Sequence, residues 1–228
     1  MQNFKNERLL VIAPHSDDEV LGCGGLISKI KKDGGKVFVL FFNLGFEKND
    51  TKESQIQRRK EVVDAMKFLN VDDYEIIFKE PNENRDLDAR PLHSLIEIIE
   101  TEGRISLEKI NPTIVAIPTI FSHHQDHIHV FNACIAALRP ISTPISNVVI
   151  SYEAPEHSRW SAMGVFEPNL YVDIENVIEK KIKAFYKYKS QIRPGGRDEY
   201  SIKNQARYRG QEVGKKYCEA FFVHRFIL

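Results

Sequence analysis

The chain has 228 residues, enough to bury most of its apolar surface, and we expect residues 1–228 to form a single domain. Lys plus Arg and Asp plus Glu both total 32, so no overall field draws the chain to nucleic acid or to an acidic membrane. No window approaches the roughly 18 consecutive apolar residues of a membrane span, and the N-terminus lacks the apolar stretch of a signal peptide. Three widely spaced cysteines, Cys23, Cys134 and Cys218, argue against a disulfide framework and fit a reducing cytoplasm.

Short apolar runs rich in β-branched residues alternate with longer amphipathic stretches, a pattern typical of β-α-β units around a parallel sheet. The predicted strands are residues 8–14, 36–42, 74–78, 113–118 and 147–152. The predicted helices are residues 20–33, 53–69, 92–103, 127–138 and 175–188. Nearly continuous apolarity in the strands indicates that both faces of the sheet are covered. We therefore expect an α/β, Rossmann-like, three-layer fold with a mostly parallel central sheet.

The glycines of LGCGG, residues 21–25, come early in the first predicted helix. They do not match the G-x-G-x-x-G spacing of a dinucleotide site, and acidic residues precede them where pyrophosphate would be repelled. Close packing of this helix on the sheet is the better account of Gly22, Gly24 and Gly25.

Two polar clusters follow predicted strands. In the stretch VIAPHSDDEVLGCGG, residues 11–25, an apolar run leads into Asp17, Asp18 and Glu19, whose adjacent carboxylates need a cation, a proton or solvent to be tolerated. The second cluster is FSHHQDHIH, residues 121–129. Ligands of open parallel sheets bind beyond the carboxyl ends of the strands, so we expect both clusters to lie at one edge of the sheet.

A divalent metal would explain this arrangement. Catalytic zinc commonly takes three protein ligands from histidine and carboxylate, with a position left open for water. His15 and Asp18 lie close enough in sequence to reach one ion, and His127 could complete the set from the second cluster. The bound cation would offset the repulsion among the acids.

The remaining polar residues of the clusters suggest catalytic roles. Asp17, beside the ligand Asp18, is the candidate general base for water activated by the metal. His124 and His127 flank Asp126 in an H-x-D-H pattern. A carboxylate partner favours the cationic form of an imidazole, so we expect Asp126 to orient His124 and His124 to stabilise an oxyanion.

PHSDDEVLG with a downstream HQDH resembles the PIG-L (LmbE-like) family of metal-dependent N-deacetylases. The resemblance extends to RRKE at residues 58–61, similar to an R-x-x-E helix of the family, and to ARYRGQEVGKKYCEAF at residues 206–221, similar to its C-terminal signature. It covers most of the chain.

The resemblance implies the same roles at matching positions. These are His15, Asp18 and His127 as metal ligands, Asp17 as base, and His124 with Asp126 behind it as oxyanion partner. The chain departs from the family pattern at Ser16, where proline is usual, and at Cys218, where alanine is usual. Neither departure removes a group that the mechanism needs.

Substrate contacts are expected from Arg85 and Glu153, because bidentate groups on loops after strands can hold a sugar or a phosphate. The resemblance implies that Arg58 also faces the substrate. Arg58 has an equally good structural interpretation as the partner of Glu61 in an intrahelical ion pair. Glu19 has two interpretations. Its carboxylate either stabilises the first turn of the following helix, at the positive end of the helix dipole, or it contacts and orients the site residues.

These inferences together predict a metal-dependent hydrolase that removes the N-acetyl group from an N-acetylglucosamine-type amino sugar. Zn²⁺ is the expected cofactor, although the same ligands suit Fe²⁺, Co²⁺, Ni²⁺ or Mn²⁺. The expected partner is a small N-acetylated amino sugar or conjugate, without nucleic acid or a membrane span; a homo-oligomer is left open. The alternatives are a non-catalytic sugar-nucleotide binding module on the same fold and a metal-dependent hydrolase of a different amide.

Overall fold

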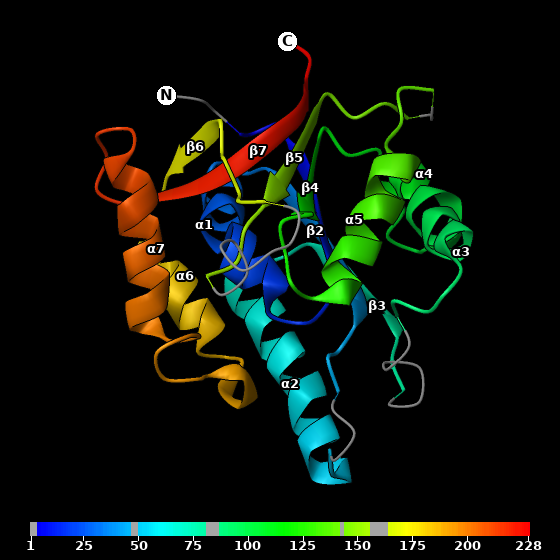
Figure 1. Ribbon diagram of the computed structural model, residues 1–228, viewed down its shortest axis with the longest axis horizontal. Coiled ribbons are helices and arrows are strands. Elements are labelled where there is room, and N and C mark those ends of the chain that lie inside the picture. The colour runs from blue at the N-terminus through cyan, green and yellow to red at the C-terminus, as the bar shows by residue number, and fades with distance from the viewer. Residues whose placement is uncertain (1–3, 47–49, 81–86, 142–143, 156–163) are drawn as a thin grey trace.

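Seven strands form one sheet at the centre of the computed structural model, which describes residues 4–46, 50–80, 87–141, 144–155 and 164–228 (Figure 1). In spatial order the strands are β3 (Asp73–Phe78), β2 (Lys36–Asn43), β1 (Arg8–Ala13), β4 (Ile114–Pro118), β5 (Val148–Tyr152), β7 (Cys218–Phe226) and β6 (Leu170–Asp173). Neighbours among β1 to β5 pair in parallel, whereas β7 is antiparallel to both β5 and β6. The predicted mostly parallel sheet is confirmed.

Helices cover both faces of the sheet and complete the three expected layers (Figure 1). One layer holds α1 (Asp18–Lys32), α2 (Lys52–Leu69), α6 (Ile178–Phe185) and α7 (Glu199–Gln211), with a 3-10 turn at Lys189–Gln191. The other holds α3 (Leu92–Glu97), continued by a π-helical turn at Ile98–Glu102, then α4 (Leu107–Ile110) and α5 (Gln125–Ala137). None of the described helices combines the length and the apolar content needed to cross a bilayer.

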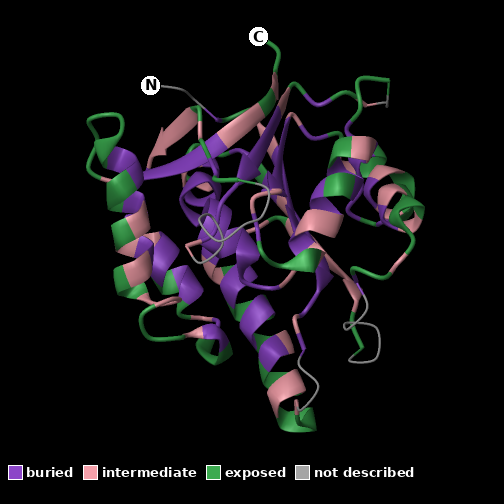
Figure 2. Ribbon diagram, in the orientation of Figure 1, coloured by how far each residue is buried: buried purple, intermediate pink, exposed green. Residues whose placement is uncertain are grey.

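Strand β1 shows why the inner strands are apolar throughout. Leu9, Val11 and Ala13 belong to the apolar cluster under α1 and α2, whereas Leu10 and Ile12 belong to the cluster under α3 and α5. Alternate side chains of a strand point to opposite faces, and here both faces are buried (Figure 2). Strand β1 therefore has no polar face.

Three elements near the C-terminal end of the chain were not predicted. Strand β6 has four residues, and β7 is buried at its start but becomes partly exposed toward its end. Helix α7 buries Ile202, Ala206, Arg209 and Gly210 and is otherwise polar. Short length, one-sided burial and a polar composition weaken the periodicity from which such elements are predicted.

The glycines of helix α1 pack closely against neighbouring side chains, as expected. A Cβ added to Gly22 would lie 2.1 Å from the ring of Tyr152 on β5, and one added to Gly25 would lie 2.5 Å from Ile174. Such distances are shorter than van der Waals contact, so only glycine allows this approach of α1 to the sheet.

The order of the strands places the two polar clusters together. Strands β1 and β4 are neighbours and run parallel, with Leu9 opposite Ile114. From β1 the chain continues through α1 on one face, and from β4 it continues through α5 on the other. This is a topological switch point, where the loops after two adjacent strands diverge and leave room for a ligand.

Candidate active site

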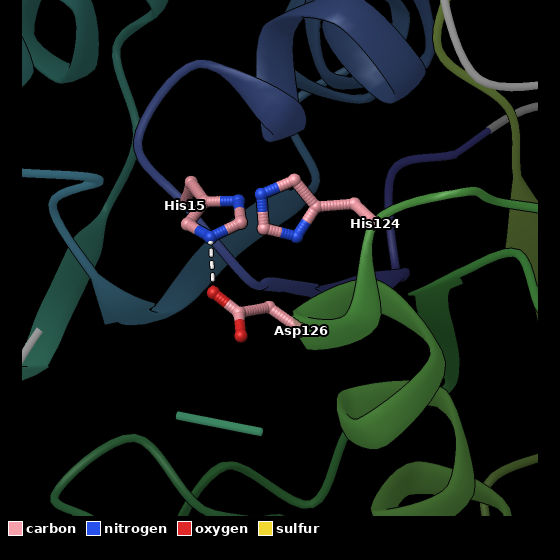
Figure 3. Close-up of side chains that lie close together, drawn as sticks. All are labelled: His15, His124 and Asp126. Carbon is pink, nitrogen blue, oxygen red and sulfur yellow. Dashed lines mark hydrogen bonds and ion pairs between the residues drawn. The ribbon is translucent and has the colours of Figure 1, made fainter. Parts of the chain in front are cut away.

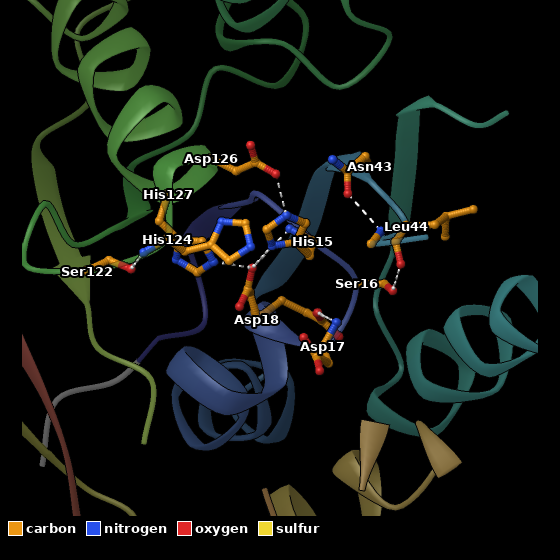
Figure 4. Close-up of polar contacts among 12 residues, drawn as sticks. His15, Ser16, Asp17, Asp18, Asn43, Leu44, Ser122, His124, Asp126 and His127 are labelled. Atoms are coloured by element: carbon orange, nitrogen blue, oxygen red, sulfur yellow. Dashed lines mark hydrogen bonds and ion pairs between the residues drawn. The ribbon is translucent and has the colours of Figure 1, made fainter. Parts of the chain in front are cut away.

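The loop between β1 and α1 positions the first two predicted ligands. Strand β1 ends at Ala13 and α1 begins at Asp18. The backbone N–H of His15 donates to Asp18 Oδ2 at 2.9 Å, which ties the two ligands together within the turn. Ser16, at the position usual for proline, donates from Oγ to the carbonyl of Leu44 at 3.0 Å and so anchors the turn to the end of β2 (Figure 4).

His127 approaches the same point from the first turn of α5. Asp18 Oδ2 lies 3.4 Å from His15 Nδ1 and 3.3 Å from His127 Nε2. Donors at about 2.0–2.1 Å from a tetrahedral ion are separated from one another by about 3.3–3.4 Å. Asp18 and His127 are buried, and the ligand atoms of all three residues lie within 4.8 Å of one another. The chemistry and the spacing of this donor set fit a divalent cation.

Asp126 contacts His15. Its Oδ2 lies 2.8 Å from His15 Nε2, the distance of a strong hydrogen bond (Figure 3). In the tautomer in which Nε2–H donates this hydrogen bond to Asp126, Nδ1 is unprotonated and its lone pair faces Asp18 and His127. This carboxylate–histidine arrangement commonly supports a metal ligand. Asp126 was expected behind His124, and the structure gives it His15 as a partner.

The pKa values show how the carboxylates stabilise positive charge. Burial lowers the pKa of His15, but hydrogen bonds with Asp126 and Asp18 outweigh this effect and raise the pKa to about 9. Burial raises the pKa of Asp18, yet the charge and hydrogen bond of His127, with those of His15, hold that pKa well below its usual range. A metal ion bound to this cluster would compete with a proton on His15.

The environment of His124 favours its neutral form. Its ring lies against His15, with centroids 4.7 Å apart, and near His127, at 5.4 Å. Burial and the charges of these two imidazoles lower the pKa of His124 to about 4, and the opposing effect of Asp126 is smaller. The direction of this shift is opposite to the predicted cationic form, and a neutral His124 would donate an N–H hydrogen bond.

Asp17 is held by an arginine that the sequence did not indicate. Arg197 donates from Nη1 to Asp17 Oδ2 at 2.9 Å, and it comes from the turn before α7. Burial raises the pKa of Asp17 to about 7, although the charge of Arg197 opposes this shift. Nothing in local periodicity links residues 180 positions apart, and only the packing of α7 brings them together.

Glu19 completes the acidic triplet and is fully buried. Its Oε1 accepts from the hydroxyl of Tyr188 at 2.7 Å, and its Oε2 accepts from the backbone N–H of Asp17 at 3.0 Å. Burial raises its pKa to about 8. The three adjacent carboxylates are thus tolerated in three ways, because Asp18 faces imidazoles, Asp17 faces a guanidinium and Glu19 faces a hydroxyl.

The predicted substrate contacts have different surroundings. Arg58 is buried and donates from Nη1 to the carbonyls of Leu44 and Gly45 at 2.8 and 3.3 Å, and its charge acts on the pKa of Asp17. Both oxygens of Glu153 accept from Arg209, at 2.5 and 2.8 Å, so this carboxylate forms a buried ion pair with α7. Arg85 lies outside the described residues.

Fold and site together define a class: an α/β protein with a largely buried His/Asp/His cluster at the switch point of its sheet. The GlcNAc-PI de-N-acetylase (PIG-L) family matches residues 10–138, and the chain belongs to this family of deacetylases. The match includes all six residues predicted as ligands or catalytic groups.

Individual relatives agree with this assignment. The chain is 26% identical over 190 residues to the uncharacterized deacetylase YaiS of Escherichia coli K12, covering 82% of this chain and 92% of YaiS. It is 25% identical over 226 residues to diacetylchitobiose deacetylase of Thermococcus kodakarensis, covering 93% of this chain and 81% of that protein. The crystal structure of the conserved protein TT1542 from Thermus thermophilus superposes with a TM-score of 0.76 at 25% identity, covering 97% and 96%. The predicted family and fold are confirmed.

Proposed function

We propose that this chain is a divalent-metal-dependent hydrolase that removes the acetyl group from an N-acetylglucosamine-type sugar, releasing acetate and a free amine. The observation that carries the proposal is the cluster of His15, Asp18 and His127, with donor separations of 3.3 and 3.4 Å around Asp18 Oδ2. Membership of a deacetylase family and the similarity to diacetylchitobiose deacetylase support the reaction and the substrate class.

The ligands would hold Zn²⁺, with Fe²⁺, Co²⁺, Ni²⁺ or Mn²⁺ as other ions that suit them. Such an ion acts as a Lewis acid on a carbonyl and lowers the pKa of water. Asp126 would keep His15 oriented through the 2.8 Å hydrogen bond at Nε2.

The chain's own groups would move the proton and stabilise charge. Asp17, fixed by Arg197, would take a proton from the attacking water as its oxygen adds to the acetamide carbon. His124 would donate an N–H to the developing oxyanion. The C–N bond would then break, and Asp17 would deliver the proton to the amine nitrogen.

The three cysteines are buried and unpaired, which supports a reducing compartment such as the cytoplasm as the place where the protein works. Because the formal charges balance at neutral pH, recognition of the sugar depends on local groups. Arg58 is the described candidate, because its guanidinium lies beside the turn that holds His15 and Asp17.

The test is release of free amine by the purified protein from N-acetylglucosamine, diacetylchitobiose, a nucleotide-linked N-acetylglucosamine and simple glycosides. Each would be assayed after chelation and after addition of Zn²⁺. We expect release that the chelator abolishes and the metal restores. No release from metal-loaded protein would direct the search to other amides, whereas no release and no metal binding would favour a sugar-nucleotide binding module.

A further inference from the structure

Asp17 has an unusual backbone conformation, with φ 104° and ψ −26°. The other described non-glycine residues with positive φ are Asn70, at 60°, and Asn111, at 47°, which end helices in the ordinary left-handed region. A larger positive φ is sparsely populated by residues that carry a Cβ, and it persists only where the surroundings impose it. The backbone is therefore strained at Asp17, the residue proposed as the base.

The polar groups of Asp17 are fixed by its surroundings. Its carbonyl accepts from the N–H groups of Val20 and Leu21, in the first turn of α1. Its carboxylate accepts from Arg197. Its own N–H donates to Glu19 Oε2 at 3.0 Å. In the last contact, a side chain in the first turn of the helix reaches back to hold the peptide of the strained residue, as in a capping box.

Glu19 is itself anchored from a distant element. Tyr188 follows α6, is fully buried, and donates its hydroxyl to Glu19 Oε1 at 2.7 Å. A chain of two hydrogen bonds thus runs from the end of α6 to the Asp17 peptide. A carboxylate that only favoured the helix dipole would not need burial or these two partners.

We propose that Glu19 is a positioning residue that holds the Asp17 peptide in its strained conformation, with Tyr188 fixing Glu19. The consequence is geometric: His15 and Asp18 can face one cation while Asp17, between them, keeps its carboxylate set before substrate binds. The catalytic part of this inference rests on the proposed function, whereas the strain does not.

The first experiment separates the acceptor from the charge of Glu19. Glu19→Met keeps a similar length and removes the acceptor, and we expect kcat to fall roughly a hundredfold, as for a misplaced catalytic group, with KM and metal affinity little changed. Glu19→Gln is neutral but keeps a carbonyl oxygen for the Asp17 N–H, and the Tyr188 hydroxyl can accept from its amide, so it should restore most of kcat. Equal losses in the two variants would overturn the proposal in favour of a charge effect.

The second experiment measures the strain without any assay of activity. Glycine ordinarily lowers stability relative to alanine, because it loses more conformational freedom on folding. At a strained positive φ the order should reverse, so metal-free Asp17→Gly should melt several degrees above metal-free Asp17→Ala. In the Glu19→Met background this gap should shrink, because the peptide can then relax.

The two experiments fail in distinguishable ways. If the wild-type protein releases no amine, the proposed function fails, and the glycine–alanine gap still tests the strain. If Glu19→Met does not fold, two other measurements carry the test. One is the glycine–alanine gap in the wild-type background. The other is the kcat of Tyr188→Phe, which should fall by less than the roughly hundredfold expected for Glu19→Met. An alanine variant as stable as the glycine variant, or an unchanged kcat in Tyr188→Phe, would contradict the proposal.

Discussion

Helix α1 contacts two buried carboxylate clusters that differ in how their charge is neutralised. In its middle, Glu219 of β7 accepts from the N–H groups of Gly25 and Leu26 at 2.6 and 2.7 Å and from Lys181 Nζ at 2.7 Å. The same lysine donates to the carbonyl of Leu21 at 2.7 Å. We call this the closed cluster, because protein groups already surround both charges.

At its N-terminal end, α1 carries Asp17, Asp18 and Glu19, with His15 and His127 opposite Asp18. We call this the open cluster, because imidazole and carboxylate donors converge there at the spacing of metal ligands. The comparison shows that burial of a carboxylate does not by itself indicate function. What distinguishes the two clusters is whether the neighbouring groups are cations and N–H donors or additional ligands.

The largest expected effect is on catalysis at the open cluster. Asp17→Asn keeps the shape of the side chain and its tolerance of positive φ, but removes the proton acceptor. We expect kcat to fall by about 10²–10⁴-fold while the metal content of the protein is unchanged. Steady-state kinetics with metal analysis of the same sample would check this, and retained turnover would remove Asp17 from the proposed role.

The largest effect on stability is expected at the closed cluster. Lys181→Met leaves the buried Glu219 without its cation and should lower the free energy of unfolding by about 3–5 kcal/mol. The matched control is Lys183→Met, on the exposed side of α6, for which we expect a change within about 0.5 kcal/mol. Urea denaturation of both variants provides the measurement. Equal stability of the two would mean that the closed cluster contributes little.

Metal addition should stabilise the protein through the open cluster alone. At a free metal concentration of 100 times Kd, binding contributes about 2.7 kcal/mol, or roughly 5–11 °C in Tm. Thermal melts with and without Zn²⁺ would show this shift in the wild type and in Lys181→Met, whereas His127→Ala should lose it. A shift that survives in His127→Ala would place the metal elsewhere.

The smallest effect concerns His224, which belongs to neither cluster and lies near the rings of Phe131 and Phe222. Burial lowers the pKa of His224. His224 therefore binds a proton more readily in the unfolded chain than in the folded one. As pH falls through about 6.5, the pKa of an unfolded histidine, protonation of the unfolded state lowers the free energy of unfolding. His224→Gln should reduce the loss of stability between about pH 7 and pH 5 by less than about 0.5 kcal/mol. Denaturation curves across that range would detect it, and a steeper loss in the variant would contradict the sign.

The strands that the sequence predicted are those whose apolar residues form continuous or nearly continuous runs. Strands β1 to β5 lie where the apolar runs placed them, and every predicted end lies within one residue of the observed end. Strand β6 was missed because it has only four residues. Strand β7 was missed because it becomes partly exposed toward its end and includes the charged residues Glu219 and Arg225. Parallel neighbours bring strand ends together, so the convergence of residues 15–18 with 124–127 could be inferred without coordinates.

Several contacts that could not be predicted depend on how α6 and α7 pack. Tyr188 reaches Glu19 and Arg197 reaches Asp17 from segments whose sequences contain no signal for those partners. Glu153 was predicted to contact the substrate, and in the structure it pairs with Arg209. This pairing could not be predicted for the same reason, because the guanidinium comes from α7. Roles in catalysis stay predictions, whereas the positions of His15, Asp18 and His127 are those that the pattern indicated.

The interior position of β7 has a consequence for how the protein is made. Every predicted ligand and catalytic group lies between residues 15 and 127, so a ribosome synthesises all of them long before Cys218–Phe226. Until β7 inserts between β5 and β6, the nascent sheet has an unpaired edge at β5, and α1 lacks the carboxylate of Glu219. The N-terminal portion should therefore need protection from aggregation during translation. Maturation of the site would follow the docking of β7, which is synthesised after all the predicted ligands and catalytic groups.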